Sequence, residues 1–184
     1  MGSASDEHDH LAQPLGKLLA RLEVNLLTGA GRGVMTSVSR AFTQSERTLG
    51  VCIGIVPCAD DPNRPKIENR KTRKDGYPND FVELPINTHL PYSGKKGTHK
   101  LSRNHINILS STAIVALPGG AGTASEVRLA VEYEKPIIAF TSDDSRVAEF
   151  PEDVPCVSRI EEVEAFLRKH INEVASLKKH LPRD

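Results

Sequence analysis

The residues best suited to chemistry lie in one stretch, which reads LPGGAGTASE over positions 117–126. An apolar run at 113–117 precedes it, and apolar residues at helical spacing follow it. This order predicts a buried strand, a glycine turn and a helix that begins near Thr123. Glycine lets a ligand approach the backbone, and the first N–H groups of a helix attract anions such as phosphate. We therefore expect phosphate to bind at Gly119, Gly120, Ala121, Gly122 and Thr123.

Glu126 follows this turn by about one helical turn, and its role is open. Phosphate binding alone does not require a carboxylate there, so Glu126 is a candidate for acid–base or electrostatic catalysis. The spacing from Thr123 to Glu126 also fits a capping box, in which the glutamate bonds to the Thr123 backbone N–H and only stabilises the helix. The sequence does not decide between these two roles.

A second glycine loop follows the apolar segment 24–27 and precedes a helix expected at 34–44. Its three glycines fall one residue short of the G-x-G-x-x-G dinucleotide pattern. One interpretation is a second part of the ligand site, and the other is a tight turn that lets a strand and a helix pack closely. The candidate ligand contacts in this loop are Gly29, Gly31 and Gly33.

The remaining pattern positions these loops. Strands are expected at 24–27, 50–56, 81–86, 113–117, 135–140 and 154–157, and helices at 11–21, 34–44, 98–110, from about 123 and from 158. Alternating strands and helices predict an α/β protein with a three-layer, doubly wound parallel sheet. We expect a single domain over 1–184, with its ligand at the carboxyl ends of the strands, where both glycine loops emerge.

Residues 57–100 interrupt the pattern as a long proline-rich insert. A connection of this length is typical of a lid or a binding loop, and it is a source of Tyr77, Tyr92 or Lys95 for a ligand pocket. The insert carries a basic cluster that is either solvated or in contact with substrate phosphate or a partner. This cluster consists of Arg64, Lys66, Arg70, Lys71, Arg73 and Lys74.

Composition excludes several classes of function. The 24 basic residues balance the 24 acidic ones, and aromatic residues make up 4%, so neither a nucleic-acid binder nor a membrane-surface protein is indicated. No apolar run is long enough to span a membrane. Three widely spaced cysteines, Cys52, Cys58 and Cys156, suit a reduced cytoplasmic protein without a metal site. No cofactor is expected.

The stretch Pro118-Gly119-Gly120-x-Gly122-Thr123-x-x-Glu126 resembles the PGGxGTxxE signature of the Lonely Guy family, the cytokinin riboside 5′-monophosphate phosphoribohydrolases. This family belongs to a wider Rossmann-like, "lysine decarboxylase-like" group that includes molybdenum cofactor carrier proteins. The resemblance extends over about 26–140. It implies hydrolysis of the N-glycosidic bond of a nucleoside 5′-monophosphate, AMP or a cytokinin nucleotide, to free base and ribose 5-phosphate. It also implies catalytic roles for Arg103 and Glu126, and a homodimer or larger homo-oligomer.

The sequence departs from the family pattern in three ways. Asn104 stands where the family commonly has lysine, so a cation near the substrate is lost, although we still count Asn104 among the substrate contacts. Gly2-Ser3 resembles a turn that follows the family's first strand, so that strand is expected to be missing or a stub. The insert is longer than the family's usual link.

Two alternatives remain open. One is a non-catalytic binding or carrier protein for a nucleotide-like anion such as molybdenum cofactor. The other concerns Arg103 alone, as a surface arginine paired with a nearby acid.

Overall fold

The computed structural model describes residues 1–46, 49–59, 75–142 and 150–179. Its strands form two parallel three-stranded sheets. The first has the order β1-β2-β3, from Leu26–Thr28, Cys52–Val56 and Leu84–Asn87. The second has the order β4-β5-β6, from Ile114–Ala116, Ile137–Phe140 and Cys156–Val157. The chain is therefore an α/β protein with a Rossmann-like alternation of parallel strands and helices.

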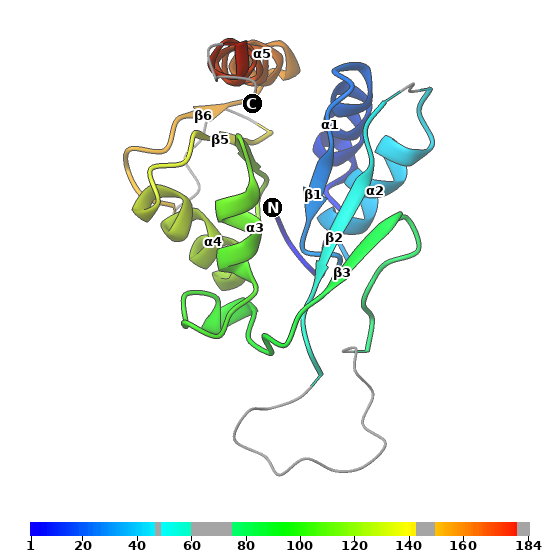
Figure 1. Ribbon diagram of the computed structural model, residues 1–184, viewed down its shortest axis with the longest axis vertical. Helices are drawn as coiled ribbons and strands as arrows, with labels where there is room; N and C mark the ends of the chain where they lie inside the picture. The colour runs from blue at the N-terminus through cyan, green and yellow to red at the C-terminus, as the bar shows by residue number, and fades with distance from the viewer. Residues whose placement is uncertain (47–48, 60–74, 143–149, 180–184) are drawn as a thin grey trace.

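Helices cover the two sheets in separate groups (Figure 1). Helices α1 (Asp9–Arg21) and α2 (Val34–Thr43) pack on each other and, with α5 (Ile160–Lys179), enclose the largest apolar core. Helices α3 (Asn104–Ser110) and α4 (Ala121–Glu132) pack on each other beside β4, where residues such as Ile108 and Leu129 are buried. A short 3₁₀ turn, η1 (Gly94–Lys96), lies against α4.

No strand among the described residues joins the two sheets, and the first residue of the chain lies between them (Figure 1). The Met1 amine donates to the Val115 carbonyl at 3.0 Å, and the Leu117 N–H donates to the Met1 carbonyl at 2.9 Å. These two bonds are the pattern of a parallel pairing around Ala116. Met1 thus pairs with β4 as a residue of a parallel strand does.

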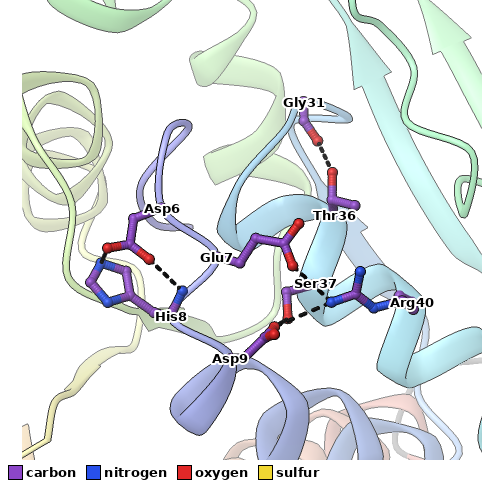
Figure 2. Close-up of polar contacts among 8 residues, drawn as sticks. All are labelled: Asp6, Glu7, His8, Asp9, Gly31, Thr36, Ser37 and Arg40. Atoms are coloured by element: carbon purple, nitrogen blue, oxygen red, sulfur yellow. Dashed lines mark hydrogen bonds and ion pairs between the residues drawn. The ribbon is translucent and has the colours of Figure 1, made fainter.

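The segment after Met1 is fixed on α2 by a polar network (Figure 2). The Arg40 guanidinium contacts Glu7 at 2.8 Å and Asp9 at 3.2 Å. The Ser37 hydroxyl also donates to Asp9, and this bond, with smaller contributions from Gln13 and the Arg40 charge, lowers the pKa of the Asp9 carboxyl. Farther along the segment, the Val34 N–H at the start of α2 donates to the Ser3 carbonyl at 2.9 Å. The N-terminal segment therefore covers the beginning of α2.

The predicted strands are confirmed to within a few residues, and β3 lies at an edge, as expected for a strand containing Pro85. The predicted helix over 98–110 is wrong in its first half, because α3 begins only at Asn104. Local turns replace that half: the Ser102 N–H donates to the His99 carbonyl at 2.7 Å, and the Ser102 hydroxyl accepts from the Asn104 N–H. The basic cluster of the insert lies outside the described residues.

Candidate anion-binding site

Arg103 is the central residue of the site. It is the residue just before α3, and it is only 3% exposed. Its Nε and Nη1 atoms are buried and have no hydrogen-bond partner among the described residues. The interpretation of Arg103 as a surface arginine paired with an acid is therefore wrong. A buried guanidinium without a counter-charge is unusual, because several kcal/mol are needed to remove an ion from water.

The Arg103 guanidinium lies directly over the loop that follows β1. A side-chain atom added at Gly29 would collide with it, so only glycine allows this approach. The Tyr77 ring also lies near the cation, with its centroid 5.8 Å from Cζ of Arg103. A side chain at Gly31 would in turn approach the Tyr77 ring. The insert thus supplies Tyr77 to the site.

The other two insert residues expected near a ligand, Tyr92 and Lys95, lie in or next to η1, which packs on α4. Tyr92 packs edge-on against His99, with Nζ of Lys96 4.6 Å from its ring centroid. Lys95 is exposed in η1.

The N-terminus of α4 is partly open. The helix begins at Ala121, two residues earlier than predicted, with Gly120 as its N-cap and no side-chain capping bond. Because Thr123 is inside the helix, the capping box that was one of the two roles open for Glu126 does not form. Gly120 and Ala121 are exposed, and nothing lies within 4 Å of a side-chain atom added at Gly120. The Thr123 hydroxyl is buried without a hydrogen-bond partner in the described chain.

Several of the predicted glycines have packing roles. A side chain at Gly119 would collide with Thr123 and Ser3, and one at Gly122 would press on Gly94 of η1. Gly33 has a φ of +64°, and a side chain added there would collide with the Ser3 backbone of the N-terminal segment. At Gly33 the structure therefore favours the tight-turn interpretation over ligand contact.

Glu126 lines a cavity of about 700 Å³ that Gly29 also lines, so this residue borders the space between the two sheets. No ion pair between Glu126 and Arg103 is found within the described residues.

Asn104 is 2% exposed, and Gly97 packs on its amide nitrogen, which places this side chain beneath a loop. The prediction that Asn104 contacts substrate directly gains no support from this position.

Asn79 is a site residue that the sequence reasoning missed. Its side chain donates to the Gly31 carbonyl at 2.9 Å, and its backbone N–H donates to the Ala30 carbonyl at 2.8 Å. Asn79 therefore fixes the glycine loop under Arg103. The signal available in the sequence was an asparagine next to Pro78, which is typical of a turn and not of any particular site.

The described residues contain no group of three or more His, Cys, Asp or Glu side chains that could hold a metal ion. They also contain no helix whose length and apolar character would let it cross a membrane.

The strand-and-helix alternation defines a Rossmann-like protein, and the buried arginine and the partly open start of α4 make a candidate anion-binding site. The chain belongs to the SLOG cluster4 family, whose model matches residues 1–167. A protein of Archaeoglobus fulgidus without an assigned function is 26% identical over 163 residues, which cover 85% of this chain and 90% of that protein.

Two solved structures are similar to this chain over most of its length. One is the molybdenum cofactor binding protein of the phototrophic bacterium Rippkaea orientalis, with 27% identity, 90% and 88% of the two chains covered, and a TM-score of 0.64. The other is the Moco carrier protein of Chlamydomonas reinhardtii, with 26% identity, coverage of 94% and 95%, and a TM-score of 0.64. These comparisons support the wider group named by the sequence resemblance and do not confirm the Lonely Guy family specifically.

Proposed function

We propose that this chain binds a phosphorylated, nucleotide-like small molecule of the molybdenum cofactor type and carries it chemically unchanged. The observation that carries the proposal is the buried Arg103 guanidinium, which has two unpartnered nitrogen atoms. An anionic group of a ligand supplies the missing counter-charge. The similarity to a molybdenum cofactor binding protein and a Moco carrier protein supports this ligand class.

The side chains present fit such a ligand. Arginine binds phosphate with two parallel hydrogen bonds, and Gly29 leaves space for the guanidinium beside the backbone. The exposed start of α4 at Gly120 and Ala121 offers backbone N–H groups and the positive end of the helix dipole. The unpartnered hydroxyl of Thr123 lies in the same turn of the helix. These groups orient and hold an anion, and none of them needs to change protonation to do so.

The test is equilibrium binding of isolated molybdenum cofactor to the purified protein, followed by mass spectrometry of the recovered ligand. We expect tight binding, an intact ligand, and a loss of affinity of about 10-fold to 100-fold in Arg103→Met, because a hydrogen bond to a charged group contributes about 1.5–3 kcal/mol. The control is Arg128→Met, since Arg128 is an exposed residue of α4. Absence of binding by the unmodified protein, or equal affinity of Arg103→Met, contradicts the proposal.

Hydrolysis of a nucleoside 5′-monophosphate is the second candidate function, and the position of Glu126 favours it. Because the capping box does not form and Glu126 lines the cavity shared with Gly29, this carboxylate is available to act on a bound sugar. Incubation with AMP and N6-modified AMP, followed by chromatography for free base, tests this function. Release of base that is lost in Glu126→Gln and retained in Glu132→Gln, a change at an exposed residue of α4, favours the enzyme. No release by the unmodified protein contradicts it.

A further inference from the structure

Tyr77 is an aromatic residue of the candidate site whose ring is only partly covered. It is half-buried, and its ring centroid lies 5.8 Å from Cζ of Arg103. No hydrogen bond of its hydroxyl group is found within the described residues. The other two tyrosines are used in packing: the Tyr133 hydroxyl bonds to Nδ1 of His105 at 2.7 Å, and the Tyr92 ring packs edge-on against a histidine. Tyr77 therefore keeps ring surface open beside the buried cation.

The position of Tyr77 is fixed through the residues that follow it. The Asn79 side chain donates to the Gly31 carbonyl at 2.9 Å, and the Asn79 N–H donates to the Ala30 carbonyl at 2.8 Å. The Phe81 N–H in turn donates to the Asn79 side-chain oxygen at 3.1 Å. A side-chain atom added at Gly31 would lie 3.1 Å from Cε1 of Tyr77, so the glycine lets the ring approach the loop. Because the ring is held beside this loop before a ligand arrives, little ordering is needed on binding.

The surroundings of the Tyr77 ring are positively charged. Besides Arg103, the Arg32 guanidinium lies against Gly76, the residue before Tyr77, since a side-chain atom added at Gly76 would lie 3.2 Å from Nε of Arg32. Two cations beside an open aromatic ring do not suit an apolar peptide, because it would desolvate them without a counter-charge. They suit an anion that also carries a flat ring, since aromatic rings stack on each other and arginine binds phosphate.

We propose that Tyr77 determines the specificity of the site for a ring: the planar ring of a nucleotide-like anion stacks on Tyr77 while its phosphate binds Arg103. This inference rests on the proposed function and narrows the ligand class. Because the Tyr77 ring centroid lies 5.8 Å from Cζ of Arg103, the ring and the phosphate of the ligand must be joined by a compact linker, such as one sugar. Stacking on an aromatic side chain tolerates different heterocycles, since each has a π face. Tyr77 therefore favours planar rings as a class over ring-free sugar phosphates.

The first test compares ligands with and without a ring by calorimetric titration, using isolated molybdenum cofactor, AMP and ribose 5-phosphate. In Tyr77→Leu we expect about a 10-fold loss of affinity for the two ring-bearing ligands, because their stacking is lost, and no change for ribose 5-phosphate. Tyr77→Phe keeps the ring and should bind all three ligands as the unmodified protein does. An equal loss of affinity for ribose 5-phosphate in Tyr77→Leu overturns the inference, because Tyr77 would then only support Arg103.

The second test uses the absence of tryptophan from this chain. Tyr77→Trp introduces a single indole ring, and we expect AMP to quench its fluorescence by stacking and ribose 5-phosphate to leave it unchanged. The matched control is Tyr133→Trp, since Tyr133 is also half-buried and lies at the opposite end of α4 from the candidate anion site. Equal quenching in the two variants, or no quenching in Tyr77→Trp, contradicts stacking at this position.

The titrations also separate this inference from the proposed function. If the ring-bearing ligands bind equally to the unmodified protein and to Tyr77→Leu, the proposed function stands and the inference is overturned. If AMP binding depends on Tyr77 and molybdenum cofactor does not bind, the inference stands and the proposed ligand is wrong. Absence of binding of all three ligands by the unmodified protein overturns both.

Discussion

At the scale of single residues, the site depends on a cation kept without a counter-charge. Arg103 is buried close to the Gly29 backbone and the Tyr77 ring, and no acidic side chain among the described residues forms an ion pair with it. Such an arrangement is unfavourable for the free protein and favourable for binding an anion, since the guanidinium is already desolvated and oriented before the ligand arrives.

Replacement of Arg103 by methionine should therefore change stability and binding in opposite directions. Without ligand, we expect Arg103→Met to raise the free energy of unfolding by about 1 kcal/mol or more, because methionine fills the space without a buried charge. Differential scanning calorimetry would show this as a rise in melting temperature of roughly 2–4 °C per kcal/mol for a chain of this size. A lower melting temperature would mean that the guanidinium has a structural role, and Arg128→Met provides the neutral comparison.

At the scale of elements, the two glycine loops are similar in sequence and different in use. The loop before α4 leaves Gly120 open. The loop before α2 is covered, because the Ser3 carbonyl accepts the first N–H of that helix. The N-terminal segment thus occupies at α2 the place that an anion is proposed to take at α4.

Substitution by alanine should affect stability differently in the covered loop before α2 and in the open loop before α4. Gly33→Ala should lower the free energy of unfolding by about 1–3 kcal/mol, because Gly33 has a positive φ and a side chain would collide with Ser3. Gly120→Ala should change it by less than about 0.5 kcal/mol, since that position has ordinary dihedral angles and open space. Urea denaturation measures both changes, and equal destabilisation would contradict the assignment.

The sequence predicted the elements well where local pattern controls them. The apolar runs at 50–56 and 135–140 became β2 and β5, because uninterrupted apolar residues are buried on both faces of a parallel sheet. The helix before the central strand was predicted six residues too early, because the Ser102 hydroxyl and the His99 carbonyl stabilise turns that periodicity does not reveal. The spacing placed Arg103 near the ligand loops, but its burial against Gly29 depends on contacts between distant segments, which one sequence does not display.

At the scale of the whole molecule, two half-sheets share a central space that is only partly filled. The predicted homodimer remains a prediction at this scale, and a dimer mass by light scattering at micromolar protein concentration would support it. The α-amino group of Met1 lies in this space, where it is buried. This position is unusual, because the α-amino group of a chain usually lies in water.

The buried position of the Met1 amine makes the stability of the folded chain depend on pH. Burial lowers the pKa of the Met1 amine in the folded chain, whereas the unfolded chain takes up a proton at the ordinary value of 8.0. Between these two pKa values the unfolded chain holds more protons, so the contribution of this amine to stability increases as pH rises toward 8.0. We expect Nα-acetylation to remove this slope, and the difference in melting temperature between free and acetylated protein should shrink as the buffer becomes more alkaline. A difference that is constant with pH would show that the amine titrates as if it were in water.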